Sequence, residues 1–362
     1  MKSICFIAQF PPPIHGLSKA VETLYSSPLQ SKYCFHKVNI TNNKEILKKL
    51  WKITILKSDL FYFTIAQTKG GNWRDLLILK LIQWKQTKCL IHLHGGYYRT
   101  LIEQDCGKLQ KKLNYQAMSH VTGTIVLGNS LKSIFKEIVD EKKIFIIPNC
   151  VDEQYMLNTI NYQTKINQLA SQPILHILYL SNFIESKGYK EVLELALRAQ
   201  MEQKKTLHFH FAGKFFEEKE RIYFENFITE HQLENIITYH GIISGKKKYD
   251  LLNLCNVFIL LTRYPNEGQP ISILEAMGNA MAIITTNHAG IPDIVTNKEN
   301  GLVIDKNNIN LEKIYDYILH LDEKRRSLIK ICERNYNMAQ SNYTEQQYIN
   351  NMDNVFQKIL EQ

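Results

Sequence analysis

The sequence predicts an α/β protein made of two doubly wound domains, in each of which a parallel sheet carries helices on both faces. The chain has 362 residues, a length typical of two domains. Short β-rich runs alternate with helical stretches along the whole chain, which favours parallel sheets. The alternation restarts in the second half, which indicates a second domain of the same class.

Each half supplies a full set of elements. The strands expected in the first half are residues 3–10, 35–40, 60–65, 89–94, 124–127 and 144–147, and the helical stretches between them include residues 17–26, 73–85 and 130–139. The strands expected in the second half are residues 175–180, 207–212, 236–239, 257–261, 282–285 and 302–304. The helices expected between those strands are residues 189–203, 218–231, 247–254 and 271–277, with helix throughout after residue 311.

The polar stretch 158–172, followed by Pro173, is the linker that the sequence suggests. We therefore expect a first domain over residues 1–165 and a second over 166–340. A C-terminal helix is expected over residues 341–362, packing back on the first domain.

The composition excludes several classes of protein. Hydrophobic residues make up 44% and charged residues 22%, as in ordinary globular proteins and unlike disordered chains. No apolar run approaches the ~20 residues of a membrane span, and the apolar run before Pro11 is too short for a signal peptide. The seven cysteines are scattered without a C-x-x-C pair, which favours reduced thiols in a cytosolic protein.

The positive charge lies in the first half of the chain. Residues 1–165 contain 23 Lys and Arg against 11 Asp and Glu, whereas residues 166–362 contain 21 against 24. A basic domain concentrates anions such as nucleic acid, an acidic membrane surface or a phosphorylated substrate. The alternative is a set of solvated lysines with no such partner.

The segment 44–57 (KEILKKLWKITILK) bears on whether the basic half of the chain binds an anionic partner. Lys44, Lys48 and Lys52 recur on one side of a helix, while Leu47 and Trp51 fall on the other. Such a helix suits the surface of an anionic bilayer, or it packs its apolar side against the core. The run 246–248 (KKK) is expected to be a solvated group of charges.

Open parallel sheets bind ligands beyond the carboxyl ends of their strands. Polar or glycine-containing segments follow the expected strands in both halves, so the expected site is a cleft between the domains. These segments are residues 9–16, 94–96, 181–182, 213–214, 241, 262–268 and 286–290.

The segment 266–277 (NEGQPISILEAM) has the most specific pattern. Pro270 suits the first turn of a helix, and Gly268 lets a ligand approach the backbone. The backbone N–H groups at residues 269–272 then form a site for phosphate. Glu267 and Glu275 are each able to accept hydrogen bonds from sugar hydroxyls, although Glu275 also simply favours the start of a helix.

This E-x7-E element resembles the signature of the family 4 glycosyltransferases, which have the GT-B fold. Five other segments resemble motifs of that family in the same order: residues 11–16 (PPPIHG), 94–95 (HG), 148–152 (PNCVD), 181–188 (SNFIESKG) and 288–295 (HAGIPDIV). The resemblance implies two Rossmann-like domains facing across a cleft. It also implies an acceptor site in the first domain and a nucleotide-sugar site in the second.

The resemblance further implies a role for each matching residue. His94, Glu267 and Lys187 are the expected catalytic residues, with His94 near the reactive face of the sugar and Lys187 neutralising the diphosphate. Glu275 is expected to bind the ribose, and Glu267 to hold the hydroxyls of the donor sugar. The remaining donor-binding residues are expected to be His15, Gly16, Asn182, Gly213, Lys214, Arg263, Gly268, Gln269, Pro270 and Ile271.

The sequence departs from the family pattern at two phosphate contacts. Asn182 stands where the family has a phosphate-binding Arg, so Lys214 and Arg263 are the candidates for the second cation. His15 precedes Gly16 where two glycines are common, so His15 is a candidate phosphate contact. The acceptor-binding residues are not indicated by the sequence.

The resemblance implies a retaining, metal-independent glycosyltransferase with a UDP- or GDP-sugar as co-substrate. Its acceptor is expected to be a saccharide or lipid-diphosphate-linked saccharide in cell-surface polysaccharide biosynthesis, such as a capsule or O-antigen. The expected location is cytoplasmic, peripheral at the inner face of the cell membrane. The alternatives are a sugar-nucleotide epimerase of the same architecture and a basic nucleic-acid-binding protein.

Overall fold

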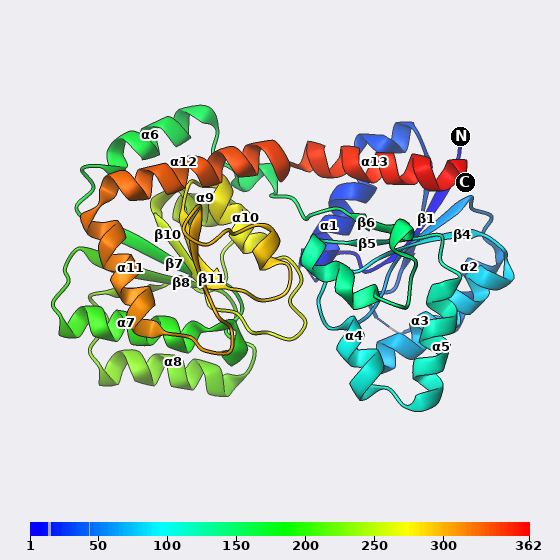
Figure 1. Ribbon diagram of the computed structural model, residues 1–362, viewed down its shortest axis with the longest axis horizontal. Coiled ribbons are helices and arrows are strands. Elements are labelled where there is room, and N and C mark those ends of the chain that lie inside the picture. Colours follow the sequence, from blue (N-terminus) through cyan, green and yellow to red (C-terminus); the bar gives the residue numbers. More distant parts are fainter. Residues whose placement is uncertain (14–15, 43) are drawn as a thin grey trace. The chain divides into compact units, whose positions relative to one another are not determined.

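The computed structural model describes residues 1–13, 16–42 and 44–362, and the chain divides into two compact units (Figure 1). Unit 1 consists of Met1–Cys150, Pro265–Gln269 and Glu345–Gln362, and unit 2 of Val151–Tyr264 and Pro270–Thr344. The expected boundary at residue 165 lies inside a helix of unit 2, and the C-terminal helix belongs to unit 1.

Unit 1 contains a six-stranded sheet in the order β2-β1-β3-β4-β5-β6, in which every pair of neighbours is parallel. Its strands are β1 (Ser3–Ala8), β2 (Cys34–Asn39), β3 (Leu60–Thr64), β4 (Lys88–His92), β5 (Gly123–Val126) and β6 (Ile144–Ile146). The strand order reverses between β1 and β3, which is where such a sheet binds ligands.

The helices of unit 1 cover both faces of this sheet. They are α1 (Gly16–Tyr25), α2 (Ile46–Ile55), α3 (Lys69–Trp84), α4 (Tyr98–Thr100), α5 (Lys108–Ser119) and α13 (Glu345–Glu361), with the 3-10 helix η3 (Asn129–Phe135). The C-terminal α13 buries Met352, Phe356 and Ile359 in the core of this unit. Phe356 packs edge-on to Phe6 and Tyr62, which fixes the last helix to β1 and β3.

Unit 2 contains a second parallel sheet, in the order β12-β11-β10-β7-β8-β9. Its strands are β7 (Leu175–Leu180), β8 (Leu207–Ala212), β9 (Ile237–Tyr239), β10 (Val257–Leu260), β11 (Ala282–Thr286) and β12 (Gly301–Ile304). Its helices are α6 (Thr159–Leu169), α7 (Tyr189–Met201), α8 (Glu218–Glu230), α9 (Gly245–Leu254), α10 (Ile271–Gly278), α11 (Leu311–Glu323) and α12 (Arg325–Asn342). The strand order reverses between β7 and β10.

All twelve expected strands are present, which confirms the doubly wound α/β prediction. The expected linker at residues 158–172 is wrong, because most of it forms α6, which packs against α12. Where a helix was expected at residues 130–139, the structure has a shorter 3-10 helix, η3, which ends at Phe135. The expected helices also omitted α5, whose sequence is largely polar.

Helix α6 is held in unit 2 by a buried lysine. Lys165 Nζ donates to the carbonyl oxygens of Leu252, Cys255 and Asn279 at 3.2, 2.6 and 2.7 Å. These carbonyls lie at the C-terminal ends of α9 and α10, where backbone acceptors lack helical partners and a positive charge is favourable. Burial lowers the pKa of Lys165 to about 8, while all three ammonium protons have acceptors.

A row of three histidines runs across the unit 2 sheet, from His176 on β7 through β8 to His240, the residue after β9. His210 on β8 exchanges hydrogen bonds with His176 Nδ1 at 2.9 Å and with His240 Nε2 at 3.0 Å. Burial lowers the pKa of His176 to about 4 and that of His210 to about 3. These rings are therefore neutral at physiological pH in the folded protein.

Among the described residues, none of the helices is long and apolar enough to cross a membrane. All seven cysteines are free thiols, as the scattered spacing predicted.

Candidate functional site

The reversal between β7 and β10 carries the basic residue expected to bind phosphate. Lys187 ends a short 3-10 helix, η6 (Glu185–Lys187), and its Nζ lies 4.7 Å from the centre of the Tyr264 ring. Gly188 follows with φ +85°, and a side chain there would meet the backbone of Leu261 at 2.6 Å. Arg263 N donates to Ser186 O at 2.7 Å, so the segment after β10 is fixed against the segment after β7.

The two candidates for the second phosphate cation differ in their surroundings. Arg263 Nη2 forms a salt bridge with Glu191 Oε1 at 2.6 Å. Lys214 is exposed, and its carbonyl accepts from Phe183 N at 2.8 Å, beside the exposed Asn182. Gly213 has φ +146° and a Cβ there would lie 1.8 Å from Ser181 O, so only glycine fits between these loops.

Glu275 lies at the second turn of α10 and is 5% exposed. Lys248 of α9 forms a salt bridge with its Oε1 at 2.6 Å. The same ammonium lies 4.3 Å from the centre of the Tyr155 ring, and the Tyr155 hydroxyl accepts from Gly245 N at 3.0 Å. The expectation that 246–248 is a solvated run is therefore wrong for Lys248, which is a partner of the predicted ribose-binding carboxylate.

The segment Pro265–Gln269 belongs to unit 1, although we expected it in the second domain. The physical reason is its contacts with the loops after β4, β5 and β6. Gln269 accepts from Asn149 N at 2.8 Å through its side chain and from Asn149 Nδ2 at 2.9 Å through its carbonyl. Its Nε2 donates to Leu127 O at 3.1 Å.

Gly268 is packed against the backbone at the end of β4. A Cβ at this position would lie 2.3 Å from His94 O and 3.0 Å from Gly95 Cα. Glycine is therefore required here by the close approach of two backbones rather than by its φ angle. The neighbouring Glu267 is 8% exposed, so this packing fixes the segment that carries the expected catalytic carboxylate.

His94 stacks on a second histidine that the sequence analysis did not single out. The ring centres of His92 and His94 are 3.9 Å apart. His92 is fully buried, and its Nδ1 forms a 2.7 Å hydrogen bond with the Tyr62 hydroxyl. Burial, together with the charge of His94, holds the pKa of His92 well below its usual range. The neutral His92 ring thus packs against the His94 ring on the buried side of the pair.

The structure gathers the expected residues into two groups. His94, Glu267, Gly268 and Gln269 lie together in unit 1. Lys187, Asn182, Gly213, Lys214, Arg263, Pro270, Ile271 and Glu275 belong to unit 2. Gly16 begins α1 beyond β1, whereas His15 lies outside the described residues. Pro270 is the residue that precedes α10 rather than part of its first turn.

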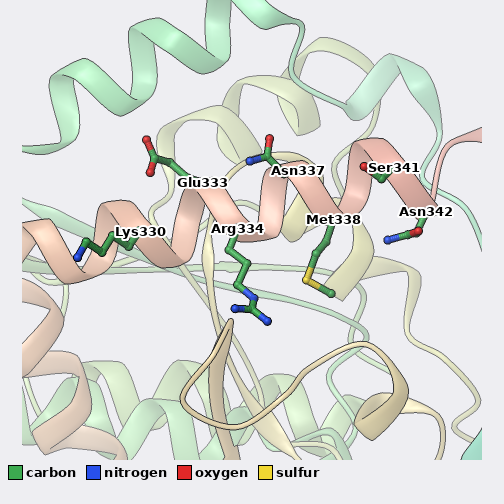
Figure 2. Close-up of a pocket in the computed structure, with 7 residues that line it drawn as sticks. All are labelled: Lys330, Glu333, Arg334, Asn337, Met338, Ser341 and Asn342. Carbon is green, nitrogen blue, oxygen red and sulfur yellow. The ribbon is translucent and has the colours of Figure 1, made fainter.

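A hollow of about 590 Å³ in unit 2 lies elsewhere, along α12 (Figure 2). All seven lining residues come from this one helix: Lys330, Glu333, Arg334, Asn337, Met338, Ser341 and Asn342. None of the expected site residues lines it, and Arg334 forms a salt bridge with Glu299 at its edge. We therefore assign the site from the strand ends and not from this hollow. Among the described residues there is no cluster of His, Cys, Asp and Glu that suits a metal ion.

Comparison with known proteins identifies the class. Residues 161–334 match the family model described as glycosyl transferases group 1. The Escherichia coli UDP-Gal:alpha-D-GlcNAc-diphosphoundecaprenol alpha-1,3-galactosyltransferase is 27% identical over 239 residues, which cover 61% of this chain and 57% of that enzyme. Residues 161–334 therefore form a group 1 glycosyltransferase domain.

Two further similarities cover more of the chain. An uncharacterized glycosyltransferase of Methanocaldococcus jannaschii, MJ1178, is 25% identical over 263 residues, covering 66% of this chain and 68% of that protein. The crystal structure of Anabaena Alr3699/HepE in complex with UDP matches with a TM-score of 0.75 at 12% identity, over 99% of this chain and 100% of that one. The likeness in structure confirms that this glycosyltransferase has the GT-B fold expected from its motifs.

Proposed function

We propose that this glycosyltransferase moves a sugar from a UDP- or GDP-sugar to a lipid-diphosphate-linked saccharide, with retained anomeric configuration and without a metal ion. The observation that carries the proposal is the position of Lys187, where the strand order reverses between β7 and β10. Ligands of doubly wound sheets bind at this point, and a lysine there suits the diphosphate of a nucleotide sugar.

In this proposal unit 2 binds the nucleotide. Glu275 accepts hydrogen bonds from the ribose hydroxyls, and its salt bridge with Lys248 holds the carboxylate in one orientation. The phosphates lie against Lys187, with Lys214 as the second cation. Lys214 is preferred to Arg263 because the guanidinium of Arg263 is held by Glu191. The complex of HepE with UDP, which has the same fold, supports a nucleotide in this class of site.

The residues proposed to hold the donor sugar lie in unit 1. Glu267 accepts hydrogen bonds from the sugar hydroxyls, and His94 faces the reactive carbon. The packing of Gly268 on His94 O supports this pairing, because it places the two residues on adjoining backbone segments.

The proposed chemistry needs stabilisation of the leaving group above all. Cleavage of the glycosyl–phosphate bond leaves a nucleoside diphosphate whose terminal phosphate is dianionic and a sugar with positive charge at its anomeric carbon. An ammonium group and backbone N–H groups aimed at the diphosphate lower this barrier by several kcal/mol. The departing phosphate oxygen then takes the proton from the attacking acceptor hydroxyl, so no nucleophile from the protein is required.

The proposed acceptor is a diphosphate-linked lipid saccharide of a cell-surface polysaccharide such as a capsule or O-antigen. The name of the Escherichia coli relative, which acts on a diphosphoundecaprenol-linked sugar, supports this class. Such an acceptor lies in a membrane, so we propose that the enzyme works as a peripheral protein at the inner face of the cell membrane.

The decisive experiment incubates the enzyme with UDP-glucose, with and without a diphosphoundecaprenol-linked acceptor, and analyses the products with EDTA present. The proposal expects sugar transfer with retained configuration, slow hydrolysis without acceptor and no effect of EDTA. Glu267→Ala is expected to reduce turnover by at least about a hundredfold. Conversion of UDP-glucose to another UDP-sugar would identify an epimerase, and undiminished turnover of Glu267→Ala would refute the site.

A further inference from the structure

Two neighbouring helices of unit 1, α2 and α3, expose an unusual number of large apolar side chains. The sequence contains three tryptophans, and all of them are exposed: Trp51 on α2 at 67%, and Trp73 and Trp84 on α3 at 42% and 71%. Tryptophan is ordinarily well buried, because its large ring gains the most from leaving water. An arrangement that leaves every tryptophan in solvent indicates a partner outside the chain.

Other apolar side chains extend this surface along the same helices. Leu47, Trp51 and Ile55 follow one another at intervals of four residues on α2, and all three are exposed. On α3, Leu77 lies one turn after Trp73 and is exposed as well. The alternative that the side of α2 with Leu47 and Trp51 packs against the core is therefore wrong, since the buried residue of α2 is Ile53.

The three helices α2, α3 and α5 lie side by side in unit 1, with α3 in contact with both of the others (Figure 1). Lys85 Nζ at the end of α3 donates to Thr54 O of α2 at 2.6 Å, which joins the two. Between α3 and α5 lies an apolar hollow of about 220 Å³, lined in part by Trp73, Leu77 and Leu113. We call this surface, formed by α2, α3 and α5, the tryptophan face.

The tryptophan face is also strongly basic. Helices α2, α3 and α5 contain nine Lys and Arg and a single acidic residue, Asp75, which is buried. Lys48, Lys52, Lys80 and Lys112 are exposed among the apolar side chains. Exposed tryptophans surrounded by lysines match the boundary of an anionic bilayer, where rings enter the headgroup layer and ammonium groups meet phosphates.

We infer that the tryptophan face is the surface by which the protein binds a bilayer of anionic phospholipid, with Trp51, Trp73 and Trp84 entering the interface. A second copy of the chain is a poorer occupant, because two such faces would bring lysines against lysines. This inference extends the proposed function, but its test requires no sugar transfer, so the two can fail separately.

The test uses the emission of the tryptophans themselves, since every one of them lies on the face. The protein is mixed with vesicles of equimolar phosphatidylcholine and phosphatidylglycerol, with part of the phosphatidylcholine brominated on its acyl chains. Emission is expected to shift to the blue and to be quenched at low salt. The effect is expected to weaken at about 1 M salt, where the Debye length is about 3 Å. Vesicles of phosphatidylcholine alone are expected to give a much smaller effect.

Variants connect the effect to individual residues. Trp51→Ser is expected to lower vesicle affinity at least about tenfold, and Lys48→Gln and Lys52→Gln about fivefold each. Because these side chains are exposed, the variants are expected to keep the thermal stability of the parent. Ile242→Ser and Lys246→Gln, exposed positions of unit 2, are the matched controls and should bind as the parent does.

Three results would overturn the inference. They are unchanged emission with anionic vesicles, a blue shift that grows with protein concentration in the absence of lipid, and a shift caused by an oligonucleotide but not by vesicles. The second would assign the face to a second copy of the chain, and the third to nucleic acid.

Discussion

Replacement of Gly268 by alanine tests the packing that fixes the segment of Glu267. The new Cβ would lie 2.3 Å from His94 O, whereas ordinary contacts begin near 3.4 Å. The backbone of one segment must therefore move by about 1 Å. Overpacking of this kind costs about 1–3 kcal/mol, and 2 kcal/mol lowers the Tm of a unit of this size by about 4–8 °C.

The effect on catalysis is expected to be larger than the effect on stability. A displacement of about 1 Å in a catalytic group reduces the rate about a hundredfold. Gly107→Ala is the matched control, because Gly107 lies in the same unit with φ −68° and a Cβ there meets no atom within 4 Å. Both variants are compared by thermal unfolding and by initial rates with a nucleotide sugar.

Two results would refute this reasoning. If Gly268→Ala keeps the parent's Tm, then Pro265–Gln269 is not packed against His94 in solution. If its Tm falls while kcat/KM stays unchanged, then Glu267 does not depend on that packing for its position.

Three other predictions follow from contacts in unit 2. Lys248→Met removes the salt bridge of the buried Glu275 carboxylate, so thermal unfolding should show a Tm lower by about 5 °C or more. Calorimetry should show a weaker affinity of this variant for UDP. Lys246→Met replaces an exposed lysine and should change neither the Tm nor the affinity. Lys187→Met should reduce kcat by about a hundredfold to a thousandfold in a transfer assay, while the exposed Lys205→Met keeps the parent rate. The pKa of His210 is about 3 in the folded state and about 6.5 when unfolded, so the unfolded chain binds more protons between these values and stability is lost as the pH falls through this window. His210→Gln should therefore show a flatter decline of Tm between pH 6.5 and pH 4, and a slope equal to the parent's would contradict this account.

The strands were predictable because apolar β-rich runs and polar helical stretches alternate along the chain, and a parallel sheet follows from that alternation alone. Helix α6 was missed because its sequence is polar. The buried residues of this helix are Tyr162, Lys165, Ile166 and Leu169, so a lysine stands among the apolar side chains. A lysine at a core position interrupts the apolar pattern by which such a helix is recognised. Its hydrogen bonds to three carbonyls explain why it is tolerated.

The sequence predicts candidate site residues but not the partners that they have in the fold. The positions of Lys187, Glu267 and Glu275 follow from strand ends and family motifs. The salt bridge from Lys248 to Glu275 joins residues 27 apart on two helices, and no spacing rule predicts such a pair. The contacts of Gly268 with His94 depend in the same way on tertiary packing.

The ammonium of Lys165 links the far ends of the two helices that carry Lys248 and Glu275. Helices α9 and α10 are thus anchored at their last turns by a single charge, while the ion pair of Lys248 and Glu275 joins the first turn of α9 to the second turn of α10 at the proposed nucleotide site. Substitutions in α6, a segment with no place in the chemistry, are accordingly able to alter recognition of the nucleotide from the opposite end of both helices. Variation in the sequence of α6 among related enzymes is therefore expected to accompany differences in substrate preference.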